Sequence, residues 1–187
     1  MERCDQNLIE RVKRRDRAAQ RELYDLYAGR LLSVSLRYVG RYDIAEDILH
    51  DAFIKVFRSI DSFIYRGEGS PRAWMERIVI NTALEWLKAQ KKIDVVSYND
   101  DYMSTKVEFV DPTSDDIERV PQSEVLRFIA DLPDGYRTVF NLYIMEGYSH
   151  REIAQELGIN EKSSSSQLLR AKRLLATKIN KYIRDNE

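Results

Sequence analysis

Cysteine, histidine, glycine and proline are all scarce in this sequence, and these shortages limit the kinds of cross-link, metal site and fold that the chain can form. Cys4 is the single cysteine, so the chain can form no intrachain disulfide and no cysteine-based metal site. The two histidines, His50 and His150, lie far apart in the sequence. Only seven glycines and four prolines occur in 187 residues, while 33% of the residues are charged. This composition favours an all-α protein.

Long apolar runs are missing as well. No stretch approaches the length of a membrane span, and the first residues, MERCDQNLIERVKRRDR, are too charged for a signal peptide. We therefore expect a cytoplasmic protein that does not insert into a membrane.

The sequence also lacks the motifs of common enzyme classes. It has no glycine-rich phosphate loop, no nucleophile elbow and no cluster of metal ligands. The serines that follow His150 are a poor signal for hydrolysis, because they belong to a different helix and no acid is marked to orient the histidine. We expect no enzymatic activity, cofactor, bound metal or small-molecule substrate.

Charge is unevenly distributed, although the net charge is only −1. Residues 1–93 carry a net charge of +4, residues 94–124 carry −7, and residues 125–187 carry +2. The acidic stretch has no sustained hydrophobic period and is longer than most connections within a compact domain. We therefore predict two small helical domains, residues 1–92 and 122–187, joined by a flexible acidic linker over residues 93–121.

Hydrophobic periodicity predicts the helices of both domains. In the first domain we expect helices near residues 5–16, 18–39, 44–60 and 71–92. In the second we expect a helix over residues 134–146 that ends at Gly147, and a frayed tail from residue 181. The inward side chains expected for the helix over 134–146 are Val139, Phe140, Tyr143 and Ile144.

The stretch from Ser149 to Ile179 has the signals of a helix-turn-helix. Ser149 and Glu152 form a capping box at the start of the first helix. Gly158 follows the last apolar residue of that helix and is a typical helix stop, and Asn160 is suited to cap the second helix. The expected buried side of the second helix carries Leu168, Ala171 or Lys172, Leu175 and Ile179.

The other side of the second helix carries small hydroxyl groups in its first turns and cations further along. Short side chains near base edges and positive charge near phosphates suit a helix whose N-terminal end enters a major groove. The alternative is a helical hairpin with a solvated face, but four consecutive serines weaken helix propensity and would contribute little to a purely structural helix. The side chains concerned are Lys162, Ser163, Ser165, Ser166, Arg170 and Arg173.

Three stretches stand out: YDIAEDILHDAFIKVFRSIDSF, RGEGSPRAWMERIVINTALEWLKAQKK and LPDGYRTVFNLYIMEGYSHREIAQELGINEKSSSSQLLRAKRLL. They resemble the extracytoplasmic-function (ECF) type of bacterial RNA polymerase sigma factor, in the sigma-70 family. Their order and spacing, with the acidic linker between them, carry the resemblance. It implies a transcription initiation factor that binds core RNA polymerase and directs it to specific promoters.

The resemblance also implies roles for individual residues of the first domain. Its third helix would contact the polymerase clamp, although glutamine and glutamate are common in the family where His50 and Asp51 stand here. The polymerase-binding residues would be Asp47, His50, Asp51, Phe53 and Lys55. The fourth helix and the loop before it would open the −10 element and hold an unstacked base. The residues implied for this step are Tyr65, Arg66, Gly67, Glu68, Gly69, Ser70, Trp74, Arg77, Asn81 and Lys88.

The second domain would read the −35 element as duplex DNA. Many family members have an apolar residue where Ser164 stands here. The residues implied for −35 binding are Arg151, Lys162, Ser163, Ser165, Ser166, Gln167, Arg170 and Arg173. The expected partners are core RNA polymerase, promoter DNA and an anti-sigma factor. The alternative hypothesis is a free-standing helix-turn-helix regulator that binds duplex DNA, which would leave the first domain and the linker without a role.

Overall fold

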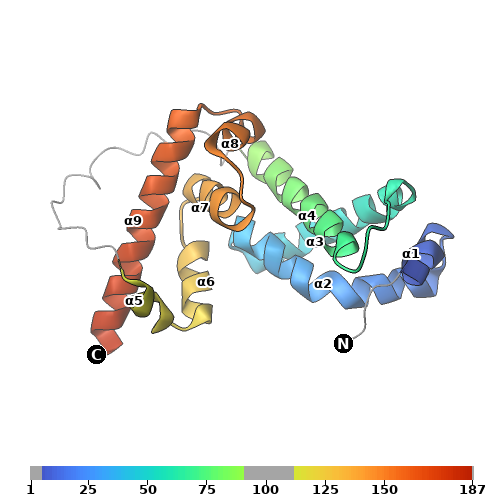
Figure 1. Cartoon of the computed structure of the whole chain (residues 1–187), viewed down its shortest axis with the longest axis horizontal. Coiled ribbons are helices and arrows are strands. Elements are labelled where there is room, and N and C mark those ends of the chain that lie inside the picture. The colour runs from blue at the N-terminus through green and yellow to red at the C-terminus, as the bar shows by residue number, and fades with distance from the viewer. Residues whose placement is uncertain (1–5, 91–111, 187) are drawn as a thin grey trace. The chain divides into compact units, whose positions relative to one another are not determined.

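The computed structural model describes residues 6–90 and 112–186, and all regular secondary structure in these residues is helical (Figure 1). The chain divides into two compact units, Met1–Trp86 and Leu87–Glu187. The all-α prediction is confirmed. Each unit is built around its own apolar core.

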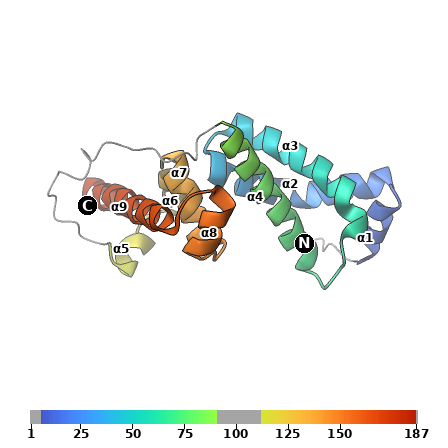
Figure 2. The ribbon, with the colours of Figure 1, turned by 90° about the horizontal axis from the view of Figure 1, so that it is seen from above.

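The N-terminal unit is a bundle of helices. It contains α1 (Gln6–Lys13), α2 (Arg17–Val39), α3 (Tyr42–Ser59), a short 3-10 turn η1 (Ile60–Ser62) and α4 (Ser70–Ala89) except for its last three residues. Helices α2 and α3 pack along each other, and α4 lies beside them in both views (Figures 1 and 2). The bounds agree with the expected helices to within a few residues.

Local chemistry explains where α2 begins and ends. The Asp16 carboxylate accepts hydrogen bonds from the backbone N–H groups of Ala18 and Ala19, at 2.9 and 3.4 Å. The bonds from Ala19 and Ala18, together with one from Arg11, hold the pKa of Asp16 below its ordinary value. Gly40 ends the helix in the left-handed conformation, at φ 68°, which glycine adopts without strain.

Within residues 112–186, the C-terminal unit has five α-helices and one π-helical turn. They are α5 (Ser114–Glu118), α6 (Gln122–Ala130), α7 (Asp134–Phe140), the π turn η3 (Asn141–Met145), α8 (His150–Leu157) and α9 (Glu161–Asn186). Helix α9 packs against α5, α6, α7 and α8. Its apolar side joins Phe128, Ile129, Leu132 and Tyr136 in one buried cluster.

Helix α5 falls inside the stretch predicted to be linker. Residues 93–111 of that stretch lie outside the described residues. Further along, the Thr113 hydroxyl accepts from the Asp116 N–H at 3.2 Å, and the Asp116 carboxylate accepts from the Thr113 N–H at 2.9 Å. This capping box starts a helix, and Val120 after it is 5% exposed within the core. The C-terminal end of the predicted linker is therefore part of the folded unit.

The prediction of an uninterrupted helix to Glu146 is wrong. The Glu146 N–H donates to the Asn141 carbonyl at 3.1 Å, a bond that spans five residues and defines a π turn. The extra residue rotates the side chains that follow it. Leu142 is fully buried, whereas Tyr143 and Ile144, which were expected to point inward, are 36% and 44% exposed.

The prediction of a frayed tail from residue 181 is also wrong, because α9 continues to Asn186. Its apolar stripe extends past Ile179 at the helical spacing. Tyr182 lies edge-on to Phe128, with ring centroids 6.2 Å apart, and Ile183 packs against the same cluster. The last turns of α9 thus cover part of the core.

Two kinds of feature are absent from residues 6–90 and 112–186. No helix there has the length and apolar character needed to cross a membrane. No group of three or more His, Cys, Asp and Glu side chains is placed to hold a metal ion.

Candidate nucleic-acid and polymerase interface

The helix-turn-helix has the geometry that its sequence predicts. The Ser149 hydroxyl accepts from the Glu152 N–H at 3.3 Å, and the Glu152 carboxylate accepts from the Ser149 N–H at 2.8 Å. Gly158 ends α8 in the left-handed conformation, at φ 67°. The Asn160 side chain then accepts from the Ser163 N–H at 2.7 Å at the start of α9. These three caps fix the turn between the two helices.

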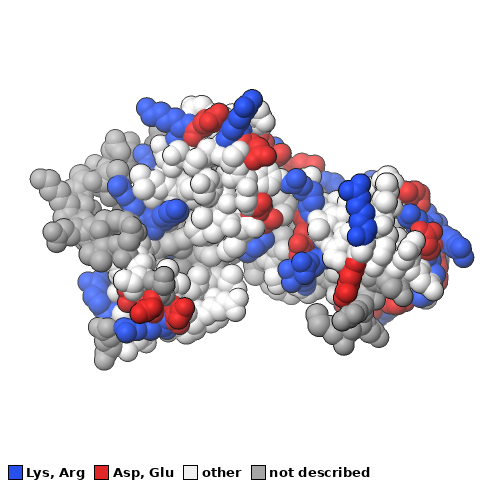
Figure 3. Space-filling view, viewed as in Figure 1, with Lys and Arg blue, Asp and Glu red and all other residues white. Residues whose placement is uncertain are grey.

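The outer side of α9 carries most of the side chains predicted to meet duplex DNA. Lys162, Ser165 and Ser166 are exposed, and Arg170 and Arg173 are partly exposed. Lys162, Ser166, Arg170 and Arg173 follow one another at four, four and three residues, which places them on one side of a helix. Figure 3 shows Lys and Arg side chains projecting from this unit where α8 and α9 meet.

Gln167 is placed differently from the prediction. It is 8% exposed, and its Oε1 has no hydrogen-bond partner in the part of the chain that the structure describes. The side chain faces α7, where it approaches Gly135 closely enough that a Cβ at that position would lie 3.0 Å from Oε1. Gln167 lies on the inner side of α9 with Ser164 and Ala171, so its predicted contact with DNA does not fit this position.

Two arginines predicted to contact DNA, Arg151 and Arg170, differ in exposure and in hydrogen bonding. Arg151, in the first turn of α8, is exposed. Arg170 is half-buried, and its Nη1 donates to the Tyr136 hydroxyl at 3.3 Å. Arg170 is thereby held against α7.

In the N-terminal unit, the loop before α4 is ordered by Ser70. The Ser70 hydroxyl accepts from the Arg66 N–H at 2.9 Å and donates to the Gly67 carbonyl at 2.7 Å. Gly67 has φ 117°, a conformation that favours glycine. The loop therefore presents a preformed backbone surface. The predicted loop residues that are exposed or half-exposed are Tyr65, Arg66, Gly67, Glu68, Gly69 and Ser70.

Helix α4 presents the remaining residues predicted for −10 DNA. Arg77, Asn81 and Lys88 are exposed, and their spacing of four and seven residues places them on one side of the helix. Trp74 is half-buried and packs on Phe63, with ring centroids 4.7 Å apart, so it joins the core to the base of the loop.

The outer face of α3 is acidic. Glu46, Asp47 and Asp51 are exposed and form no ion pair within residues 6–90 and 112–186. Two other predicted polymerase contacts are already engaged. Phe53 is 3% exposed and packs on Tyr24, with centroids 4.6 Å apart. The Lys55 ammonium pairs with the Glu85 carboxylate at 2.6 Å. The accessible polar part of the predicted surface is therefore carboxylates and His50.

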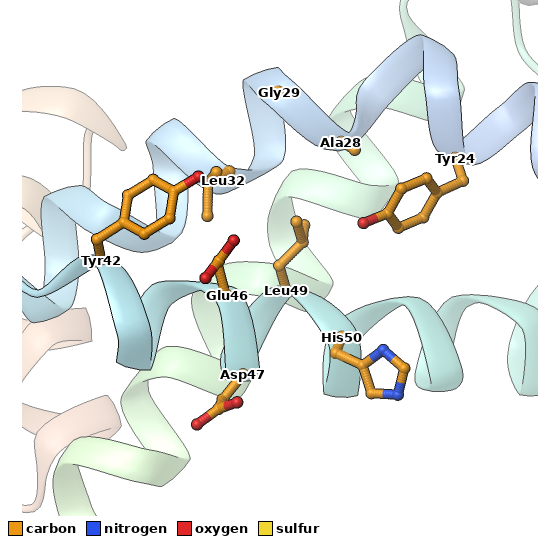
Figure 4. A pocket seen from close by; sticks show the side chains of 9 residues that line it. All are labelled: Tyr24, Ala28, Gly29, Leu32, Tyr42, Glu46, Asp47, Leu49 and His50. Atoms are coloured by element: carbon orange, nitrogen blue, oxygen red, sulfur yellow. The ribbon is translucent and has the colours of Figure 1, made fainter.

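A pocket of about 480 Å³ lies between α2 and α3, beside this acidic face. Figure 4 shows Tyr24 and Tyr42 at its two ends, with Glu46 and Leu49 pointing between them. Sequence reasoning missed Tyr24 as part of this surface, because only the packing of α2 on α3 brings it there. Its 41% exposure is the feature that distinguishes it from a core aromatic residue.

Comparisons with known proteins find two family matches in separate parts of the chain. The family description "Sigma-70 region 2" matches residues 23–93, and "Sigma-70, region 4" matches residues 122–175. The ECF RNA polymerase sigma-E factor of Haemophilus influenzae is 33% identical over 186 residues, which cover 94% of this chain and 95% of that protein. The ECF RNA polymerase sigma-E factor of Escherichia coli K12 is 30% identical over 187 residues, 96% of each chain.

Among solved structures, that of CnrH in complex with the cytosolic domain of CnrY aligns with a TM-score of 0.47 and 18% identity, covering 98% of this chain and 99% of the other. The identity over nearly the full length of two sigma-E factors, with matches to both sigma-70 regions, decides the family. The chain belongs to the ECF sigma factors of the sigma-70 family.

Proposed function

We propose that this chain binds core RNA polymerase and directs it to specific promoters, with the N-terminal unit opening the −10 element and the C-terminal unit reading the −35 element. The observation that carries this proposal is that one chain matches both sigma-70 regions, region 2 at residues 23–93 and region 4 at residues 122–175. The chain acts by binding and not by catalysis, and it works in the cytoplasm beside the polymerase.

The proposed −35 contacts are made by the first turns of α9 in the major groove. Ser165 and Ser166 are short, exposed hydroxyl groups able to donate to or accept from base edges. Lys162 and Arg173 supply charge for phosphates, and Arg151 adds a cation from α8. Because phosphate contacts release counterions, we expect binding to weaken steeply as salt increases.

The proposed −10 contacts use the loop and the outer side of α4. An unstacked base needs a backbone surface that it can approach closely, and the glycines at 67 and 69 provide one. Asn81 has an amide that can pair with the edge of a base, while Arg77 and Lys88 lie on the same side of α4 for phosphates.

The proposed polymerase contact is the acidic face of α3. Carboxylates that form no ion pair among the described residues are available to pair with cations of a binding partner, and the pocket beside them gives that partner a concave surface. An anti-sigma factor that covers this face or α9 would block transcription. Joining two modest DNA contacts through one chain and one polymerase increases their effective concentration, so neither unit needs to bind promoter DNA tightly by itself.

A free-standing regulator remains the second candidate. It would use α6–α9 alone, and it leaves the exposed amide and cations of α4 and the acidic face of α3 without a role. Binding to duplex DNA as a dimer, without any effect on polymerase, would favour it.

Replacing Asn81 with alanine is expected to reduce promoter opening about tenfold, because one base-edge contact to the unstacked strand is lost. Binding to the −35 duplex should not change. Permanganate reactivity of the melted strand measures opening, and fluorescence anisotropy measures duplex binding. Asn7→Ala, which removes the same amide from an exposed position on α1, is the matched control. An equal loss in both assays would overturn the assignment of Asn81.

A further inference from the structure

His150 lies where three elements of the C-terminal unit meet. Its Nδ1 is 2.9 Å from the Ser164 hydroxyl oxygen, which joins the first turn of α8 to the first turn of α9. Its ring stacks on Tyr143 of the π turn, with centroids 4.7 Å apart and planes inclined by 25°.

Ser164 is the buried residue of the first turn of α9, and it lies next to the exposed serines proposed to contact DNA. It is 0% exposed, and it lies between Ser163 and Ser165 in the middle of the serine run. Successive residues of a helix are about 100° apart, so the direction in which Ser164 points decides the direction of Ser165 and Ser166. A hydroxyl with no water around it needs a hydrogen-bond partner, and His150 provides one.

The π turn explains why Tyr143 is available to hold His150. An uninterrupted α-helix to Glu146 was expected to place Tyr143 inward, whereas the structure with the π turn has Leu142 buried and Tyr143 36% exposed. The stacked ring limits rotation of the imidazole, and a restrained imidazole makes a more directional hydrogen bond to Ser164. Such π turns are often found at functional sites.

We propose that His150 and Ser164 are positioning residues for promoter reading: their hydrogen bond sets the angle at which the first turn of α9 enters the major groove. This inference rests on the proposed −35 function. Neither residue needs to touch a base. A bond with a purely structural role would change the stability of the unit without changing how well it discriminates one duplex from another.

Four variants separate these two roles. Ser164→Ala removes the hydroxyl, and His150→Gln moves the polar group away from the position of Nδ1. His150→Asn keeps an amide atom near that position, so it preserves the hydrogen bond while it removes the stacked ring. The double variant Ser164→Ala, His150→Gln tests whether the two side chains act as a unit.

The readout is a specificity ratio. The full-length chain is used to select a duplex from a randomised pool, and each variant's Kd for that duplex is compared with its Kd for a scrambled duplex. We expect Ser164→Ala and His150→Gln to lower the ratio about fivefold to tenfold, because groups in one hydrogen-bond network couple by this order of energy. The double variant should lose no more than the worse single variant, and His150→Asn should recover most of the ratio.

Three results would overturn the proposal. The specificity ratios of the single variants could stay at the wild-type value. The loss in the double variant could equal the sum of the two single losses in free energy. The ratios could also return to the wild-type value when binding is measured well below each variant's melting temperature. A parallel measurement of initiation by core polymerase from a promoter with a preopened bubble keeps this claim separate from the proposed function. If the wild-type chain does not support initiation on that template, the proposed polymerase function is contradicted. The specificity ratio for duplex DNA alone decides the role of His150 and Ser164.

Discussion

Replacing Arg137 with alanine is expected to destabilise the C-terminal unit by about 3–5 kcal/mol, the cost of breaking a buried ionic group by removing one member. Arg137 is 3% exposed. Its Nη1 donates to the carbonyls of Ala130 and Leu132, both at 2.7 Å, and its Nη2 pairs with Asp134. Alanine would leave these carbonyls, at and just after the end of α6, without this donor in a largely buried site.

The pKa of Arg137 supports this reading. Burial lowers the pKa of the guanidinium below its ordinary value, and Asp134 opposes that shift. A cation buried at such a cost is retained because it satisfies several acceptors at once. Arg137 therefore fixes the corner between α6 and α7, on which the core side of α9 packs.

Urea unfolding measures the effect, with an internal reference. Both tryptophans, Trp74 and Trp86, belong to the N-terminal unit. Their fluorescence transition should keep its midpoint, while the circular dichroism gains an earlier transition from the C-terminal unit. Arg127→Ala is the control, because the Arg127 side chain is 62% exposed and an ion pair such as the one it makes with Glu124 contributes about 1 kcal/mol or less at an exposed site. If Arg137→Ala and Arg127→Ala change the unfolding transition of the C-terminal unit equally, the buried Arg137 guanidinium is not essential for stability.

Reversing two charges on α3 is expected to weaken binding to core RNA polymerase roughly a hundredfold, since like charges facing each other in an interface cost several kcal/mol. The double variant is Asp47→Lys, Asp51→Lys. Both carboxylates are exposed and make no ion pair among the described residues, so the fold should tolerate the change. Anisotropy of the labelled chain titrated with core polymerase measures the affinity.

The matched control changes the same amount of charge elsewhere on the N-terminal unit. Glu10→Lys, Asp25→Lys alters two exposed residues on α1 and α2 whose ion pairs, at 3.5 and 3.7 Å, contribute little. Affinity for core polymerase should remain close to that of the wild type. If both double variants lose affinity equally, the effect comes from net charge and the α3 surface is not the contact.

Much of this fold is predictable because its signals are local. Ser149 with Glu152, Gly158 and Asn160 act within one turn of the backbone, and all were correctly assigned from their neighbours alone. The buried row of α3 also follows from a regular period. The period of four predicts a row of Ile44, Ile48, Ala52, Val56 and Ile60. The last four are at most 2% exposed, with Ile60 in η1 just after α3, whereas Ile44 in the first turn is only half-buried.

The features that escaped prediction depend on contacts between distant residues. The π turn at Asn141 is favoured by the packing of Leu142 into the core and has no recognised local motif. The last turns of α9 are held by Phe128, more than fifty residues earlier in the chain. Gln167 is a different case, because the local helical period that places it inward with Ser164 and Ala171 was outweighed by its side-chain type and its position after the serines.

The residues of the candidate site also differ in whether local sequence signals were enough to predict them. Exposed polar residues on a single helix, such as Asp47 and Asp51 on α3 or Asn81 on α4, were placed on the surface as expected. The pocket that adds Tyr24 and the bond that joins His150 to Ser164 need two elements to be packed together first. Such pairs are visible only in three dimensions.

Run-off transcription tests the central claim most directly. The purified chain is mixed with bacterial core RNA polymerase and fragments of its own genome, with core alone and chain alone as controls. We predict discrete transcripts only when both are present, with 5′ ends that map downstream of shared −35 and −10 elements. If the chain neither binds core polymerase nor directs initiation, yet binds duplex DNA as a dimer, the account given for the N-terminal unit is contradicted and the free-standing regulator is correct.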